Sequence, residues 1–122
     1  MRAALLALVL SQSAPVLSQS PTADPVPAID AALADKQPAH AETLARAALA
    51  AAETRDGVDS LSVANLARLL GDSLFDQKRY AEAEPHYRRA LAIRLAQLGE
   101  SSADTGVSAN DLAIVLRQQE KY

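Results

Sequence analysis

The chain contains no cysteine and no tryptophan. Without thiols it has no disulfide, no thiolate nucleophile and no cysteine-ligated metal site. Aromatic residues make up only 3% of the 122 residues, whereas 49% are hydrophobic, so alanine and leucine must build most of the core. A core of small and aliphatic side chains lets helices pack closely, and the length suits one small domain.

Positive charge is also scarce, because 12 lysines and arginines stand against 15 acidic residues, for a net charge of −3. The isoelectric point is about 5.3. Proteins bind nucleic acid largely by placing cationic side chains on phosphates, and no basic stripe is present here. We therefore expect no nucleic-acid partner.

The signals of catalysis and metal binding are few. The sequence has no glycine-rich phosphate loop and no G-x-S-x-G nucleophile turn. Its two histidines are His40 and His86, and Glu82 lies one helical turn before His86. Two ligands are too few for a metal site, which needs three or four. The sequence therefore predicts no enzyme activity, no metal and no cofactor in this chain.

The first residues resemble an export signal. Met1-Arg2 precede an apolar run from Ala3 to Leu10, which is shorter than the roughly 18 residues that span a bilayer. We predict a signal peptide over 1–20, export to the periplasm or the medium, and no stable membrane insertion after cleavage. The alternative is a cytoplasmic protein with a frayed amphipathic start. Prolines and small polar residues predict a disordered linker over 21–27.

The clearest periodicity lies over residues 76–99. Large and small apolar residues recur there at helical spacing, at Tyr80, Ala83, Tyr87, Ala90, Leu91 and Leu98. Proline suits the first position of a helix, so the residues alone allow the helix to begin at Pro85. Gly99 suits the left-handed stop after the helix.

A second helix is predicted just before it, over 61–76, with Asp59 or Ser60 as its N-cap. Its apolar face consists of Val63, Leu66, Ala67, Leu70, Gly71 and Leu74. Glycine inside a helix costs about 1 kcal/mol relative to alanine, so we expect a neighbouring helix to approach closely at Gly71. Further helices are predicted over 28–35, 39–55 and 103–118, the last weakened by Gly106.

The pattern repeats along the chain. Tyr80 and Tyr122 are separated by the same interval as Gln77 and Gln119, and as Leu70 and Leu112. Shifted backwards by this interval, which we call the repeat length, Gly99 matches Gly57 and Arg88 matches Arg46. A set of matches that holds its register in both directions predicts an internal repeat of helical pairs.

These residues resemble a known family. The second helix of a tetratricopeptide repeat, in the 42-residue form found in kinesin light chains, is similar to the pattern Tyr80, Ala83, Glu84, Pro85, Tyr87, Arg89, Ala90, Leu91, Ile93, Arg94, Leu98, Gly99. The first helix of that unit is similar to Leu70, Gly71, Leu74, and the next unit begins with Asn110, Leu112, Ala113, Leu116, Gln119, Lys121, Tyr122. The resemblance implies that the helix begins near Ala81 and runs through Pro85, and we expect this start because Tyr80 and Ala83 must share a face with Tyr87. The sequence departs from the pattern at Pro38, Ala67 and Gly106.

The resemblance implies an all-α, right-handed solenoid of antiparallel helix pairs over 28–122. We expect a degenerate repeat over 28–57, a full repeat over 60–99 and an incomplete one over 103–122. The first helices of such repeats line a concave face that holds a peptide or a partner protein. By position, that face would consist of Asn65, Arg68, Asp72, Phe75, Asp76, Asn110, Asp111, Ile114 and Arg117.

Two alternatives stay open at this point. Arg68, Asp72 and Asp76 are one helical turn apart and could simply pair with each other on a solvated surface. The chain could also be the accessory or regulatory repeat region of a larger enzyme whose catalytic domain lies outside it.

The last predicted helix has no successor to cover its apolar residues Leu112, Val115 and Leu116. We therefore expect either that this chain is a fragment of a longer array or that these residues support self-association.

Overall fold

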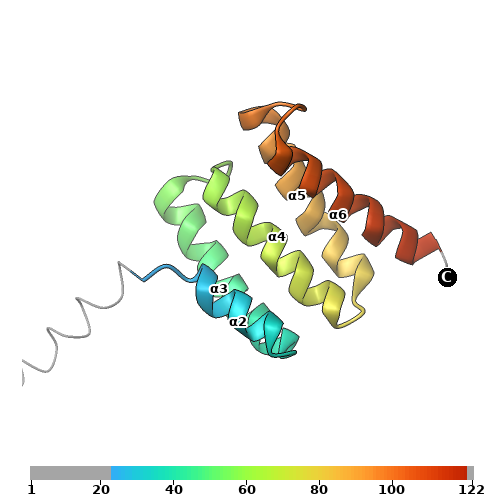
Figure 1. Ribbon diagram of the computed structural model, residues 1–122. Helices are drawn as coiled ribbons and strands as arrows, with labels where there is room; N and C mark the ends of the chain where they lie inside the picture. Colours follow the sequence, from blue (N-terminus) through green and yellow to red (C-terminus); the bar gives the residue numbers. More distant parts are fainter. Residues whose placement is uncertain (1–22, 121–122) are drawn as a thin grey trace, which may run out of the picture.

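The structure is a computed structural model that describes residues 23–120. Its helices are α2 (Val26–Ala34), α3 (Pro38–Asp56), α4 (Leu61–Asp76), α5 (Tyr80–Leu98) and α6 (Ala103–Glu120) (Figure 1). Every regular element in this part of the chain is a helix, so the predicted all-α class is confirmed. The predicted signal peptide lies outside the described residues.

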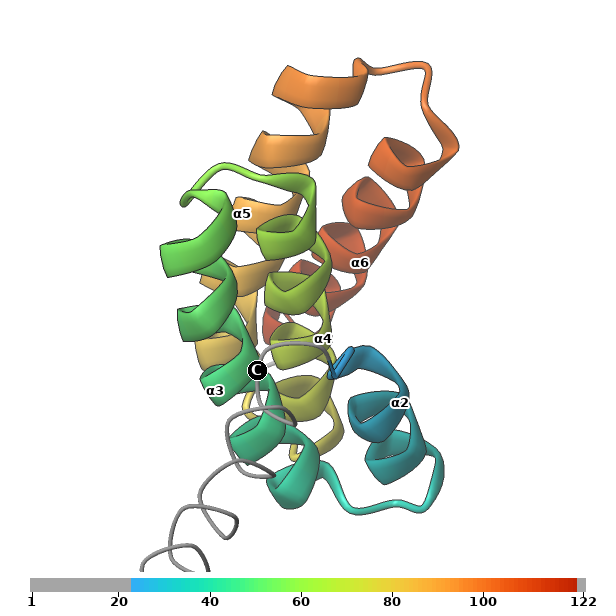
Figure 2. The ribbon, with the colours of Figure 1, turned by 90° about the vertical axis from the view of Figure 1, so that its left-hand side faces the viewer.

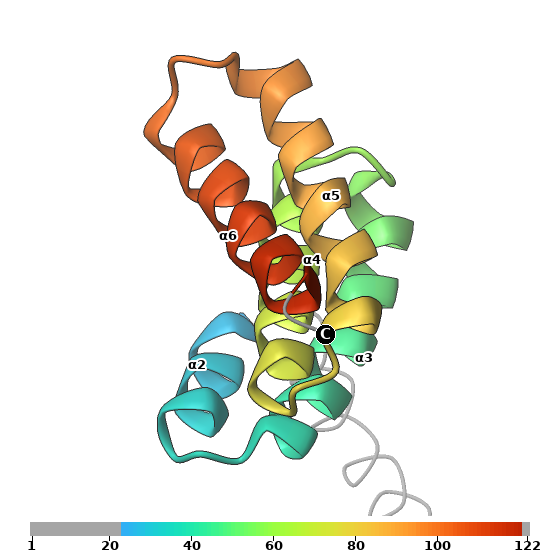
Figure 3. The same cartoon turned by 90° about the vertical axis from the view of Figure 1, so that its right-hand side faces the viewer.

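The helices form two layers. Figures 2 and 3 show α2, α4 and α6 on one side of the molecule and α3 and α5 on the other, with α4 lying between α2 and α6. Each helix packs on the next along the chain, and α4 packs on both α3 and α5. Helix α4 therefore carries the centre of the core, with the buried residues Val63, Ala64, Leu66, Ala67, Leu69, Leu70, Gly71, Ser73 and Leu74.

The predicted repeat length is visible in the backbone. Helix α5 begins and ends one repeat length after α3, at 80 and 98 against 38 and 56, and α6 begins one repeat length after α4, at 103 against 61. The loops repeat as well, because Gly57 and Gly99 end the second helices with φ of 94° and 84°. Both carbonyl oxygens then accept a hydrogen bond of 3.4 Å, from the amides of Ser60 and Ser102. The predicted repeat of helical pairs is confirmed.

The first unit is shorter than the others. Helices α2 and α4 end one repeat length apart, at 34 and 76, but α2 begins only at Val26. This start lies ahead of the predicted one, so the linker predicted over 21–27 is wrong at Val26 and Pro27. The reason is that Pro27 stands in the first turn, where a helix needs no amide proton. Because α2 matches only the second half of α4, a hollow of about 530 Å³ opens beside Leu44 and Ala48 of α3.

Helix α5 runs through its proline. It begins at Tyr80 and contains Pro85 as an internal residue, so the expected start before the proline is confirmed. Ala83, Tyr87 and Ala90 are buried as predicted. Leu98 is 39% exposed, however, because it lies at the open end of the hairpin, where Leu61 is also 43% exposed.

Helix α6 corrects one expectation about the end of the array. Val115 is fully buried, whereas Leu112 and Leu116 are only partly covered. Val115 was expected to need a following helix, but it occupies the position that the buried Ser73 has in the preceding repeat, on the side of α6 that faces the core. Self-association through this helix therefore stays a prediction that depends on Leu112 and Leu116 alone.

Within residues 23–120, no helix is both long enough and apolar enough to cross a lipid bilayer.

Candidate peptide-binding face

The nine residues predicted to bind a peptide lie on α4 and α6. Helix α4 carries Asn65, Arg68, Asp72, Phe75 and Asp76, and α6 carries Asn110, Asp111, Ile114 and Arg117. These two helices and α2 form the layer opposite α3 and α5 (Figures 2 and 3). We call the outer surface of this layer the α2–α4–α6 face.

An ion pair joins two successive repeats at the middle of this face. Arg68 on α4 donates from Nε to Oδ2 of Asp111 on α6 at 2.6 Å. The two side chains are only 29% and 15% exposed, so the pair is partly shielded from water. Arg68 thus pairs with a residue of the next repeat. It does not pair with Asp72 or Asp76 on its own helix, which was the alternative.

A small pocket lies beside this ion pair. It has a volume of about 130 Å³ and is lined by Asp72, Phe75, Tyr87, Asp111 and Ile114. Tyr87 comes from α5 in the other layer, and its hydroxyl donates to Oδ1 of Asp72 at 2.6 Å. The structure therefore brings together four of the predicted residues in one pocket.

The sequence pattern assigned Tyr87 to the core and did not predict it as a residue of the binding face. Its ring is buried, at 3% exposure, but its hydroxyl reaches the pocket. A buried tyrosine hydroxyl nearly always finds a hydrogen-bond partner. A search for a polar partner on the facing helix would have pointed to Asp72.

The pocket is acidic and partly desolvated. Burial raises the pKa of the Asp72 carboxyl, and the nearby carboxylates of Asp111 and Asp76 add to this, while Tyr87 and Arg68 act against it. Burial and the charge of Asp72 also raise the pKa of the Tyr87 phenol. Tyr87 is therefore a hydrogen-bond donor at neutral pH, and negative charge in this pocket is costly.

The other predicted residues do not line this pocket. Asn65 is half-buried, and Asp76, Asn110 and Arg117 are exposed. Within residues 23–120 none of these four side chains forms a hydrogen bond or an ion pair with another described residue.

The family model that matches the chain is the tetratricopeptide repeat, over residues 29–96 and again over 62–122. The chain belongs to the tetratricopeptide repeat family. Repeats of this family generally mediate protein–protein interactions and are typically non-catalytic scaffolds. The predicted family is confirmed, whereas the kinesin-light-chain form stays a prediction. No curated protein matches the chain.

The tetratricopeptide repeats of this chain are joined by the same polar contact twice. Gln77 donates from Nε2 to Oε1 of Glu42 at 2.9 Å, and one repeat length later Gln119 donates to Oε1 of Glu84 at 2.8 Å. Each glutamine reaches from the end of a first helix to the preceding second helix. These contacts set the register between helices, so they are part of the scaffold rather than of the binding face.

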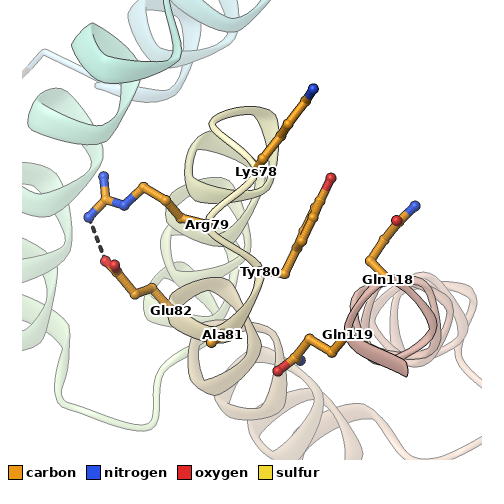
Figure 4. Close-up of a pocket in the computed structure, with 7 residues that line it drawn as sticks. All are labelled: Lys78, Arg79, Tyr80, Ala81, Glu82, Gln118 and Gln119. Atoms are coloured by element: carbon orange, nitrogen blue, oxygen red, sulfur yellow. Dashed lines mark hydrogen bonds and ion pairs between the residues drawn. The ribbon is translucent and has the colours of Figure 1, made fainter. Parts of the chain in front are cut away.

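Another hollow lies at the opposite end of α5 from Gly99. Figure 4 shows Tyr80 between Lys78 and the glutamines Gln118 and Gln119, with the Arg79 side chain turned away toward Glu82. The volume is about 360 Å³. The groups that line it can form hydrogen bonds, but they do not form a set of catalytic residues or metal ligands.

The part of the chain that the structure describes contains no group of three or more side chains suited to bind a metal ion. Glu82, which the sequence pairs with His86, forms an ion pair with Arg79 instead. Burial lowers the pKa of His86, and the positive charges of Arg46 and Arg89 add to this.

Proposed function

We propose that this chain is a non-catalytic interaction module that binds a peptide or a partner protein on its α2–α4–α6 face. The observation that carries the proposal is the Arg68–Asp111 ion pair, which joins α4 to α6 across successive repeats. Four of the residues predicted for binding, Asp72, Phe75, Asp111 and Ile114, line the pocket beside this ion pair.

The chemistry of this surface suits an extended peptide. A peptide in an extended conformation has unpaired amide and carbonyl groups, and an asparagine side chain can donate to one and accept from the other. Asn65 and Asn110 stand on the two helices that flank the pocket. Phe75 and Ile114 supply apolar contact for a side chain of the peptide. No bond of the peptide needs to be broken or made, so the role is binding alone.

A selected peptide provides the test. A peptide from a displayed random library is labelled with a fluorophore, and its affinity for the purified chain is measured by anisotropy. We expect Asn110→Ala and Phe75→Ala each to weaken binding at least fivefold, in line with the cost of truncating a central interface residue. Asp59→Ala, in the α3–α4 loop, is the matched control and leaves the affinity unchanged. If the peptide binds both face variants as tightly as it binds the parent chain, the peptide does not use this face and the proposal is refuted.

Export is part of the proposal, and it depends on residues 1–20. Expression of the full chain in a bacterial host, followed by mass spectrometry of the periplasmic fraction, tests it. We expect a shortened amino terminus, and an intact Met1 in the cytoplasmic fraction alone would contradict export.

A right-handed solenoid of such repeats stays a prediction for the same protein. So does the alternative role as the accessory region of an enzyme, which the reading frame after Tyr122 distinguishes.

A further inference from the structure

We propose that the partner segment is cationic, and that the pocket lined by Asp72, Phe75 and Asp111 holds a lysine or arginine side chain of it. This inference rests on the proposed function and names the chemistry that the α2–α4–α6 face selects. A neutral or acidic peptide on the same face would contradict it and leave the proposed function intact.

The first argument is the balance of charge on the face. Helices α2, α4 and α6 carry six carboxylates, at Asp30, Asp72, Asp76, Asp104, Asp111 and Glu120. Asp30 lies one repeat length before Asp72, so consecutive repeats place an acidic side chain at the same position. Two arginines oppose these charges, and Arg68 is already paired with Asp111. The face therefore has a negative excess, which favours a positively charged partner.

The second argument is the unused capacity of Asp72. A carboxylate can accept about four hydrogen bonds. Among residues 23–120, Asp72 accepts one, from the Tyr87 hydroxyl, and forms no ion pair. An ammonium or guanidinium group in the pocket would supply the missing donors and a compensating charge. The raised pKa of Asp72, which burial causes, has the same physical basis, because the carboxylate is partly shielded from water.

The third argument is the shape of the pocket. A volume of about 130 Å³ equals about four liquid waters at roughly 30 Å³ each, which is room for an ammonium group and its neighbouring methylene groups. The Phe75 ring and the Ile114 side chain can cover an aliphatic stem while the charge meets Asp72. The Phe75 ring adds a favourable surface for a cation. An acidic side chain would meet like charges here, which disfavours it.

Small probes test this recognition directly. The full chain, labelled with ¹⁵N, is titrated with N-acetyl-lysine methylamide, N-acetyl-arginine methylamide and the neutral analogue N-acetyl-norleucine methylamide. We expect the two cationic probes to shift the amide resonances of Phe75 and Asp111 to saturation at millimolar concentration. Norleucine has the same aliphatic stem without the charge, and we expect at least tenfold weaker binding. Equal shifts for lysine and norleucine would overturn the inference.

A single substitution at Asp72 tests whether the charge of the pocket, rather than its shape, is what binds the cation. Asp72→Asn keeps an oxygen that accepts from the Tyr87 hydroxyl, so the fold is retained, which circular dichroism verifies. We expect this variant to weaken lysine binding at least tenfold, whereas Asp59→Asn removes the same charge outside the face and binds as the parent does. Unchanged binding by Asp72→Asn would refute the cation pocket. If a library-selected peptide without lysine or arginine binds the face, the inference fails and the proposed function stands. If no peptide binds the face, both fail.

Discussion

Gly71 on α4 and Tyr87 on α5 share one space in the core: a Cβ atom on Gly71 would lie 2.8 Å from Cε1 of the Tyr87 ring. One repeat earlier the same two positions are Ile29 and Ala45, both fully buried. The large residue is thus on the first helix in one unit and on the second helix in the next. Because protein interiors are close-packed, each unit needs one small and one large residue at this contact.

The two glycines inside helices should respond oppositely to alanine. Gly71→Ala places a methyl group against the Tyr87 ring, and we expect a loss of about 1–3 kcal/mol in the free energy of unfolding. Nothing lies within 4 Å of a Cβ on Gly106, so Gly106→Ala should gain about 0.5–1 kcal/mol. Urea unfolding followed by circular dichroism measures both. Equal effects at the two sites would contradict the close contact at Gly71.

Acid should weaken the joint between α3 and α4. The hydrogen bond from Gln77, together with Arg46 and Arg79, lowers the pKa of Glu42 from 4.5 to about 2. Because the folded pKa lies below the unfolded one, the stabilisation is present above about pH 4.5 and is lost as the pH falls toward 2. We expect it to amount to about 1 kcal/mol, since solvent screens the arginines.

Unfolding curves between pH 6 and pH 2.5 test this on the parent chain and on Glu42→Gln. The variant should lose part of the acid dependence of the parent. Glu100→Gln, in the exposed α5–α6 loop, serves as the control and should keep all of it. A parent and a Glu42→Gln variant with the same slope would show that the contact does not couple to folding.

The ion pair between the repeats should be energetically coupled. A double-mutant cycle with Arg68→Met and Asp111→Asn should give a coupling of about 1–2 kcal/mol, because the pair is 2.6 Å long and partly buried. The exposed pair Arg55–Asp56 offers a comparison in which we expect no measurable coupling. Additive effects of the two changes at Arg68 and Asp111 would show that α4 and α6 are held by packing alone.

Asp72 should reduce stability where it is ionised. The pKa of Asp72 in the folded state is raised above its unfolded value. Its contribution to the free energy of unfolding is therefore most favourable below the unfolded pKa and is lost as the pH rises through the folded pKa. Asp72→Asn should therefore raise the thermal midpoint at pH 7 and change it little at pH 3. Calorimetry at both pH values measures this, and a lower midpoint at pH 7 would contradict it. A gain in stability together with a loss of cation binding would mark Asp72 as kept for binding rather than for folding.

Much of the fold could be predicted from short stretches of sequence. Helix α4 has the predicted bounds, and its N-cap Ser60 accepts from the Val63 amide at 3.2 Å. Gly57 and Gly99 end the second helices where glycine was expected to do so. These features depend on hydrogen bonds between residues close in sequence, which is why residue type and spacing reveal them.

The site required distances that no local pattern contains. Arg68 has acidic neighbours one and two turns away on its own helix, yet its partner is Asp111, in the next repeat. Tyr87 follows the apolar pattern of α5, and only the packing of α5 on α4 places its hydroxyl against Asp72. Such contacts depend on the rotation and shift of one helix against another.

By itself, the sequence determined the family, the register of the repeats and the ends of the central helices, because each follows from local hydrogen bonding and from the spacing of small and large residues. Only the tertiary structure decided which side chains meet between repeats, that Val115 is covered and that a half-length α2 leaves part of α3 open. The physical reason is that helix packing fixes the position of every side chain at once, whereas a helical pattern fixes only the side of the helix on which it lies.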